Sequence, residues 1–355
     1  MRTGKGLLGW VASLGLALVV SGCGGKAGVA GATFVDRNPL PADTMTVATA
    51  EVGHYGGRFV ISQTSGPKTF NANMANETSS TDVTDRLFTT LADFDNATQQ
   101  NVPMLAKSWE TSADGLSWTW HLRRGAAFSD GHPISADDVL FSFDIAYDDS
   151  LHPSVQDLLK IDGKRFEVTK VDSYTVVTRI PAPYALMIGA VASLRIMPKH
   201  VLEGAFRRGD FASAYTVSIA PESLVTSGAW RLKQFVPGEK TVLTRNPYWF
   251  GVDTKGQRLP YLDELVFLIV PDQDAADLKF RAGESDGIDN VKPENYAWYE
   301  ANQKAGHFTL YDVGPSLNTN FFFFNLNRVR DAKSGKRIGS PRVDPIKYAW
   351  FSNPV

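Results

Sequence analysis

Apolar and polar residues alternate in several short segments of the chain, and each of these segments predicts a β-strand. Trp118, Trp120 and Leu122 alternate with polar or charged residues directly after the Asp-Gly turn signal at 114–115. A period of two places such apolar side chains on one face of a strand, so we expect a hairpin with one buried face. Residues 265–270 are apolar without interruption, which favours a strand covered on both faces. The strand candidates are 57–62, 118–123, 175–178, 228–232, 241–243 and 265–270.

Other segments show the spacing of a helix. Within 81–91, Val83, Leu87 and Leu91 recur at every fourth position and predict a helix with one buried face. A polar loop is expected before it, at 71–80. Three more helices are predicted to begin near the capping pair Ser135 and Asp138, near Pro198 and near Asp274. The pattern as a whole indicates an irregular mixed α/β (α+β) chain.

The composition indicates sizeable packed cores. Hydrophobic residues make up 43% of the chain and aromatic residues 11%, which argues against disorder. About 320 residues follow the N-terminal segment, enough for two or three domains. Lys and Arg total 36 against 38 Asp and Glu, so no basic excess predicts a nucleic-acid partner. We expect four aromatic side chains to be core residues: Trp109, Trp118, Trp120 and Phe128.

The N-terminus has the features of an export signal. Residues 1–5 form a short basic segment, and residues 7–20 form an apolar run. Small residues then precede Cys23, the only cysteine of the chain. This arrangement resembles a bacterial lipobox, in which the cysteine is acylated and becomes the mature N-terminus. The alternative is an uncleaved membrane anchor, but the apolar run is shorter than the roughly 20 residues that a span needs. We therefore predict a lipoprotein signal peptide at 1–22 and a tether at 23–46.

No motif of a catalytic or cofactor-binding site is found in the mature chain. A nucleophile elbow, a helix-borne H-E-x-x-H and a phosphate-binding loop are all absent from the sequence. The six histidines form no H-x-x-x-H pair. The expectation is a protein without enzymatic activity, cofactor or metal. A secreted hydrolase, whose catalytic groups meet only in the fold, stays as the alternative.

Four ordered blocks of sequence resemble the family 5 extracellular solute-binding proteins, the receptors of peptide and nickel ABC transporters. They carry tryptophan-rich hairpins, Asp-Gly turns and an Arg-Asn-Pro-Tyr-Trp segment. Because they spread over most of the mature chain, they are far more specific than a single short motif. The blocks are residues 105–109, 114–139, 227–249 and 259–286.

The resemblance implies a periplasmic binding protein-like fold of the large three-lobed, peptide-binding type. Domain I would comprise 47–76 and 199–315, and domain II would comprise 77–198. Residues 316–355 would be the start of domain III, whose first strand is expected near Phe321. Members of the family continue well beyond this length, so the resemblance implies a truncated member whose third lobe is largely missing.

The same resemblance implies a lipid-anchored receptor in the periplasm or on the outer face of the cell membrane. Such a receptor captures peptides or similar small solutes and delivers them to an ABC permease; we expect it to be a monomer. A solute-sensing receptor on the same fold is a second alternative. The ligand-binding candidates are Asn76, Glu77, Thr78 and Ser79, on the polar loop that the family's cleft passes. An ordinary solvated loop is an equal alternative for these four residues.

Overall fold

The computed structural model describes residues 36–47, 51–95 and 98–312. The predicted signal peptide, Cys23 and the predicted start of domain III lie outside these residues. The chain divides into two compact units, Met1–Val291 and Lys292–Val355, and each is described by itself.

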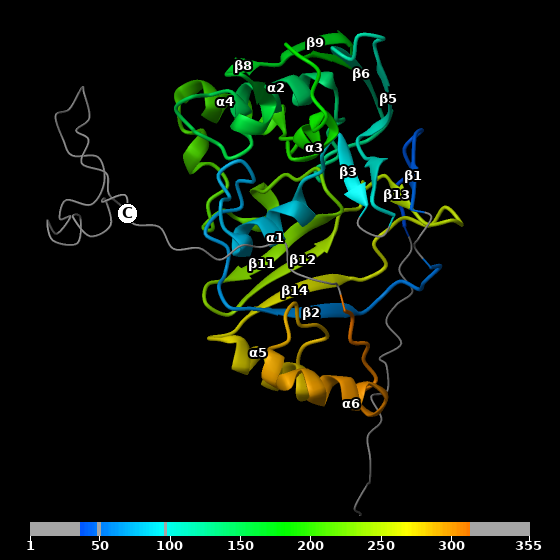
Figure 1. Cartoon of the computed structure of the whole chain (residues 1–355), viewed down its shortest axis with the longest axis vertical. Helices are drawn as coiled ribbons and strands as arrows, with labels where there is room; N and C mark the ends of the chain where they lie inside the picture. The colour runs from blue at the N-terminus through cyan, green and yellow to red at the C-terminus, as the bar shows by residue number, and fades with distance from the viewer. Residues whose placement is uncertain (1–35, 48–50, 96–97, 313–355) are drawn as a thin grey trace, which may run out of the picture. The chain divides into compact units, whose positions relative to one another are not determined.

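A four-stranded sheet in the Met1–Val291 unit joins segments that are far apart in the sequence. Its order is β11-β12-β14-β2 (Figure 1). The first three strands are antiparallel neighbours, whereas β14 and β2 run parallel. Because β14 lies between β12 and β2, its residues from Leu265 onward are apolar: Phe267 belongs to one core cluster and Val266 to another. The strands are β2 (Arg58–Gln63), β11 (Trp230–Val236), β12 (Lys240–Arg245) and β14 (Glu264–Ile269).

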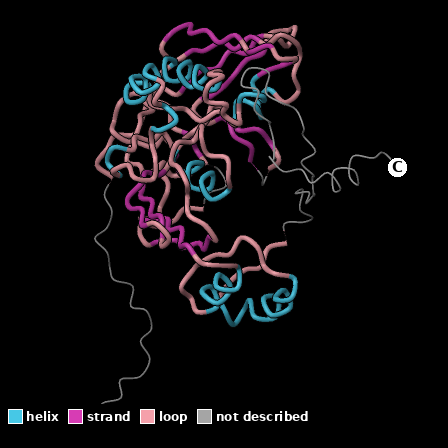
Figure 2. The backbone as a smooth tube through the Cα atoms, turned by 90° about the vertical axis from the view of Figure 1, so that its left-hand side faces the viewer, coloured by secondary structure: helices cyan, strands magenta, loops and turns pink. Residues whose placement is uncertain are grey.

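A second sheet carries the aromatic hairpin. Its order is β5-β6-β10-β9, and all neighbours are antiparallel. Trp120 pairs with Val176 across β6 and β10, and both side chains are fully buried. The two sheets lie in separate parts of the unit, with helices and loops between them (Figure 2). The strands are β5 (Ala106–Thr111), β6 (Ser117–Leu122), β9 (Glu167–Asp172) and β10 (Thr175–Arg179).

The helices of this unit pack on the sheets or lie beside them. Helix α2 begins behind Ser135 with the predicted capping box, in which Ser135 N–H donates to Asp138 Oδ2 (2.9 Å). Helix α1 packs on the first sheet through Val83 and Leu87, which share a buried cluster with Phe267. The helices are α1 (Thr78–Leu87), α2 (Ala136–Ala146), α3 (Met187–Ala192), α4 (Lys199–Arg208) and α5 (Gln273–Arg281).

Short elements complete the unit. The strand pairs are β1 (Met45–Thr46) with β13 (Gly251–Val252), β3 (Ala92–Asp95) with β4 (Gln100–Pro103), and β7 (Lys160–Ile161) with β8 (Lys164–Arg165). The 3₁₀ turns are η1 (Gln156–Leu159), η2 (Phe211–Ser213) and η3 (Pro221–Ser223).

The Lys292–Val355 unit has two described elements, η4 (Pro293–Asn295) and α6 (Tyr296–Gly306). Tyr299 is buried, and Trp298 stacks on Phe308 with ring centroids 6.3 Å apart. A small aromatic cluster therefore closes the end of α6.

Most of the predicted strands and helices are confirmed, but the helix at 81–91 was placed wrongly. It spans Thr78–Leu87 and ends where Phe88 turns to an extended conformation. Leu91 is fully buried beyond the helix, in the core of the second sheet. The four-residue spacing thus continued past the helix end because the next segment is buried as well.

The polar segment 71–80 also differs from the expectation of a loop. Asn71 and Asn73 are buried, and Asn71 donates to the carbonyl of Phe211 (2.9 Å). Its last three residues, from Thr78, form the first turn of α1. The Asn71 side chain is bonded to backbone inside the protein, and Asn73 Nδ2 is buried without a partner among the described residues, so the polarity of these residues did not indicate exposure.

The two parts of the predicted domain I, 47–76 and 199–315, contribute β2 and β11, β12 and β14, respectively, to the same sheet. The second sheet lies within 77–198. The domain bounds themselves stay predictions, and the division before Lys292 was not among them.

Truncation of Trp120 tests the core of the second sheet. Trp120 is fully buried, whereas Trp118 is only partly buried against the same cluster. We expect Trp120→Ala to lower the free energy of unfolding by about 3–5 kcal/mol, since a large cavity is left. Trp118→Ala should cost clearly less. Urea unfolding of both variants measures the difference, and equal losses would contradict this burial.

Candidate functional site

A cleft of about 450 Å³ opens at the end of β2. Segments from four parts of the Met1–Val291 unit form it: the end of β2, the first turns of α1, one side of α5, and residues 288–290. The lining residues are Ser62, Gln63, Thr64, Ser65, Thr78, Ser79, Asp82, Gln273, Ala276, Ile288, Asp289 and Asn290.

The parallel pairing of β2 brings these segments together. On its other edge β2 contacts the segment after α5, where Ile61 bridges to Gly287 and Asp286 Oδ2 accepts a hydrogen bond from Val60 N–H (2.8 Å). Residues 288–290 then leave the strand, and the cleft opens beyond this point. Figure 1 shows α5 next to the β2 edge.

The start of α1 is held by a local network around Glu77. The Ser80 hydroxyl donates to the Glu77 carboxylate and accepts from Lys68 N–H (2.9 Å). Partial burial acts to raise the pKa of Glu77, but the Ser80 hydrogen bond and the charge of Lys68 outweigh it. The pKa of Glu77 therefore lies below its ordinary value. This carboxylate is occupied in fixing the helix start.

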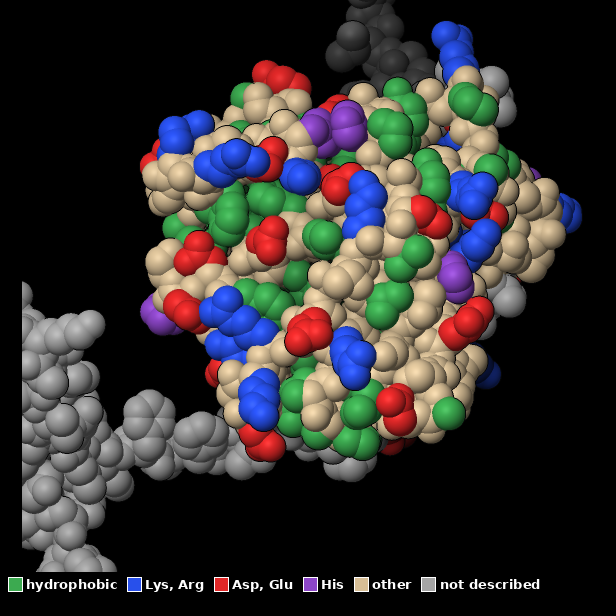
Figure 3. All heavy atoms as spheres, turned by 90° about the horizontal axis from the view of Figure 1, so that it is seen from above, with side chains coloured by type: hydrophobic (Ala, Val, Ile, Leu, Met, Phe, Trp, Pro, Cys, Tyr) green, Lys and Arg blue, Asp and Glu red, His purple; other side chains and the backbone are tan. Residues whose placement is uncertain are grey.

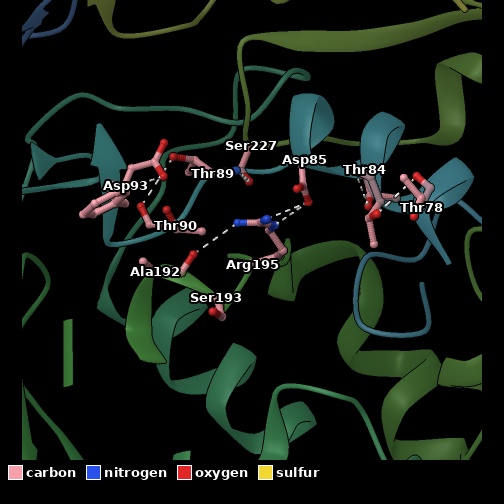
Figure 4. Close-up of polar contacts among 12 residues, drawn as sticks. Thr78, Thr84, Asp85, Thr89, Thr90, Asp93, Ala192, Ser193, Arg195 and Ser227 are labelled. Atoms are coloured by element: carbon pink, nitrogen blue, oxygen red, sulfur yellow. Dashed lines mark hydrogen bonds and ion pairs between the residues drawn. The ribbon is translucent and has the colours of Figure 1, made fainter. Parts of the chain in front are cut away.

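The opposite end of α1 is anchored on the sheet. Gly228 N–H donates to the Leu87 carbonyl (2.8 Å), and a Cβ at Gly228 would lie 2.6 Å from the Arg86 carbonyl oxygen. Arg195 Nη2 bonds Asp85 Oδ1 (2.6 Å), and Figure 4 shows this side chain between Asp85 and Ala192. These contacts fix the helix whose first turn lines the cleft.

The inner wall of the cleft contains buried polar side chains whose hydrogen bonds are incomplete. Gln63 Nε2 donates to Asp82 Oδ2 (2.8 Å). Ser62 and Gln63 are each 8% exposed, yet Ser62 Oγ and Gln63 Oε1 have no hydrogen-bond partner among the described residues. Such groups are rare in folded proteins, because an unsatisfied buried polar atom costs about 1–3 kcal/mol.

The rim is formed by Asp289 and Asn290, which are exposed residues. Gln273 Nε2 donates to the Asn290 carbonyl (3.1 Å) and ties α5 to this rim. Partial removal of the Asp289 carboxyl from water and the nearby charge of Asp82 raise the pKa of Asp289, against a smaller opposite effect of Arg86. The two carboxylates are therefore close enough to influence each other.

Two of the four predicted ligand-binding residues line the cleft, namely Thr78 and Ser79. Asn76 is exposed and Glu77 is partly buried, and neither belongs to the lining. The sequence interpretation missed Asp82, although it lies one turn after Thr78 on the same face of the helix. It also missed Gln63 and Asp289, for which no local pattern existed.

The lining contains hydroxyl, amide and carboxylate groups but no aromatic, Lys or Arg side chain. Among the described residues, no group of three His, Cys, Asp or Glu side chains is arranged to hold a metal ion. None of the described helices combines the length and hydropathy of a membrane span. On the face in Figure 3, basic and acidic side chains are interspersed. The chemistry of the cleft is that of hydrogen bonding to a small polar molecule.

The sequence profile described as "Bacterial extracellular solute-binding proteins, family 5 Middle" matches residues 100–347. The match covers well over half of the chain. The chain therefore belongs to the family 5 bacterial extracellular solute-binding proteins, as the four blocks of sequence predicted.

Curated relatives and solved structures are consistent with this family assignment. A "Probable ABC transporter-binding protein" of Deinococcus radiodurans is 30% identical over 211 residues, which are 58% of this chain and 35% of the relative. The "Periplasmic alpha-galactoside-binding protein" of Rhizobium meliloti is 34% identical over 203 residues, 55% of this chain and 29% of the relative. The structure of the periplasmic binding protein MelB from Agrobacterium fabrum, in complex with stachyose, superposes with a TM-score of 0.66 at 27% identity; it covers 74% of this chain and 42% of MelB.

These matches confirm the predicted mixed α/β fold of the periplasmic binding protein type. The chain spans about a third of the length of the first two curated relatives. The similarity thus establishes family and fold.

Replacement of Gly228 tests the close contact between this residue and the end of α1. Gly228→Ala places a methyl group against the backbone of Arg86 and Leu87, and we expect a loss of about 1–3 kcal/mol in the free energy of unfolding. Gly189→Ala is the matched control, because nothing lies within 4 Å of its added Cβ in α3. The control should be neutral or stabilising by about 0.5–1 kcal/mol. Chemical denaturation measures both, and a harmless Gly228→Ala would contradict the tight contact.

Proposed function

We propose that this protein is the extracytoplasmic solute-binding receptor of an ABC importer. It captures a peptide or a similar small polar solute and presents it to a membrane permease. The observation that carries the proposal is the polar cleft at the end of β2, in a chain of the family 5 solute-binding type. The Rhizobium relative is named for an alpha-galactoside and MelB is complexed with stachyose, so small hydroxyl-rich or amide-rich ligands are a fitting class.

The cleft supplies the groups that such a ligand needs. Thr78 is an exposed hydroxyl on the first turn of α1, and Ser79 lies beside it. Gln273 and Asn290 add amide or carbonyl groups from the other side. Polar contacts of this kind orient a ligand, while a closing movement of lobes adds contacts that exist only in the closed state. Asn76 and Glu77 would then act as neighbours of the ligand site and not as its lining.

The proposal includes export and lipid anchoring. The apolar run before Cys23 would direct the chain out of the cytoplasm, and acylation of Cys23 would hold it at the membrane surface. A single acyl chain binds membranes only weakly, so stable anchoring requires more than one. A tethered receptor stays close to the permease that it serves.

Filling of the cleft tests the binding site. Thr78→Trp places a large ring in the cleft at an exposed position, and we expect the affinity for any bound solute to fall by about tenfold or more. Thr111→Trp is the control, since Thr111 is an exposed residue at the end of β5 and lines no part of the cleft. Calorimetry of the whole chain with peptides and with stachyose provides the readout. Equal affinities of the two variants, or no binding of any solute to the wild type, would contradict the proposal.

Substitution of the single cysteine tests the anchor. In a host that processes lipoproteins, the wild type should lose residues 1–22 and gain acyl mass at Cys23. Cys23→Ala should block both changes. Mass spectrometry of the membrane fraction decides, and an unmodified Cys23 in the wild type would refute lipid attachment.

A further inference from the structure

The cleft holds two carboxylates from distant parts of the chain. Asp82 projects from α1, and Asp289 lies at the rim after the Gly287 bridge. Partial burial and, after it, the charge of Asp82 raise the pKa of Asp289. Two carboxylates kept together in a partly dehydrated site repel each other, and a cation between them removes that repulsion. Arg86 acts on Asp289 but does not line the cleft.

A second observation points to a ligand at the same place. Ser62 and Gln63 line the cleft, are more than nine-tenths buried, and leave Ser62 Oγ and Gln63 Oε1 without a partner among the described residues. On a strand, successive side chains point to opposite faces. Gln63 therefore shares the α1 face with Ile61, where it bonds Asp82, and Ser62 shares the other face with Val60. Gln63 Oε1 is thus the unpartnered acceptor on the face that carries Asp82, whereas Ser62 Oγ lies on the opposite face.

The groups in the cleft that lack a partner are hydrogen-bond acceptors or negatively charged, and this decides the kind of ligand. A carboxylate and an amide oxygen only accept hydrogen bonds, and a serine oxygen accepts as well as donates. The ligand must therefore supply several N–H or O–H donors. An anion would face two like charges, and a neutral polyol would leave those charges uncompensated.

The N-terminus of α1 is a counter-argument, because a helix start favours an anion. Its donors are partly used, however. Ser80 N–H and Thr81 N–H both bond the Glu77 carbonyl (3.0 Å each), and the Glu77 carboxylate already lies at this helix end. The carboxylates of Asp82, one turn further along the same helix, and of Asp289, at the rim, thus outweigh the helix start.

We propose that Asp82 and Asp289, together with Gln63 Oε1, form a subsite that selects solutes carrying a primary ammonium or guanidinium group. The inference rests on the proposed function, in that this cleft binds the solute, and it adds the chemical class of the ligand. Asp82 and Asp289 compensate the positive charge, while Gln63 Oε1 accepts one of its N–H groups. Neutral oligosaccharides and acidic solutes are disfavoured at this subsite.

A pair of blocked peptides tests the subsite directly. N-acetyl-Ala-Lys-Ala-amide has one positive charge, and N-acetyl-Ala-Gln-Ala-amide has similar length and none. We expect the whole chain to bind the lysine peptide about tenfold or more tightly by calorimetry at low salt. Asp82→Asn and Asp289→Asn should each bring the ratio of the two affinities close to one.

Two controls separate charge from folding. Asp157→Asn makes the same change at an exposed position of η1 that lines no part of the cleft, and it should leave the preference intact. Asp82→Glu keeps the charge on the same helix face and should retain part of the preference. Thermal unfolding of each variant is compared, since Asp82→Asn still allows a hydrogen bond from Gln63 to the remaining amide oxygen.

The outcomes distinguish the subsite from the proposed function. Binding of the glutamine peptide or stachyose as tight as that of the lysine peptide, unaffected by the Asp variants, would overturn the cation subsite and leave the receptor function standing. Absence of binding for all three probes would overturn both. A preference for lysine that persists in the Asp82→Asn, Asp289→Asn double variant would place the cation elsewhere and refute the assignment.

The pH dependence gives an independent readout. The preference for the lysine peptide should weaken as the pH falls through the pKa of Asp289, because the protonated acid no longer attracts the cation. Since the pKa of Asp289 is raised, the loss should begin at a higher pH than for an ordinary aspartate. A preference that is unchanged on acidification would contradict the role of the carboxylates.

Discussion

The parallel pairing of β2 with β14 is the contact on which the described site depends. It joins two strands that lie some two hundred residues apart in the sequence, in a register that runs from Arg58 opposite Glu264 to Gln63 opposite Ile269. A shift by one residue would turn Ile61 and Gln63 to the other face. The hydrogen bond from Gln63 to Asp82 and the packing of Ile61 against α1 would then be lost together. The cleft is thus a consequence of strand register.

Many elements of the fold could be predicted from local pattern. The aromatic hairpin, the Ser135 capping box and the apolar β14 are each encoded within a few residues, by period-two alternation, by a cap spacing and by an uninterrupted apolar run. The end of α1 was not predictable in this way. Leu91 continues the helical spacing, but it is buried in a different core after the chain has turned at Phe88.

The candidate site was only half predictable, for the same reason. Thr78 and Ser79 were found because polar residues gather before a helix. Asp289 and Gln63 meet Asp82 only through the β2 pairing and the bridge at Gly287, contacts between residues far apart in the sequence. Asn71 and Asn73 lie in a segment expected to be a polar loop, yet both are buried, and the Asn71 side chain bonds backbone inside the protein.

The polar groups of the cleft lower the stability of the folded protein when no ligand is bound. Two unsatisfied oxygens and two interacting carboxylates all disfavour the unliganded state. Val60 on the same strand is apolar and packs in a small core cluster, whereas Ser62 and Gln63 are polar. A ligand of the proposed kind, which donates N–H groups and carries positive charge, would relieve part of these costs, so that free energy lost in folding would be regained on binding. Local destabilisation of this kind is typical of functional sites, where the missing partner is the ligand.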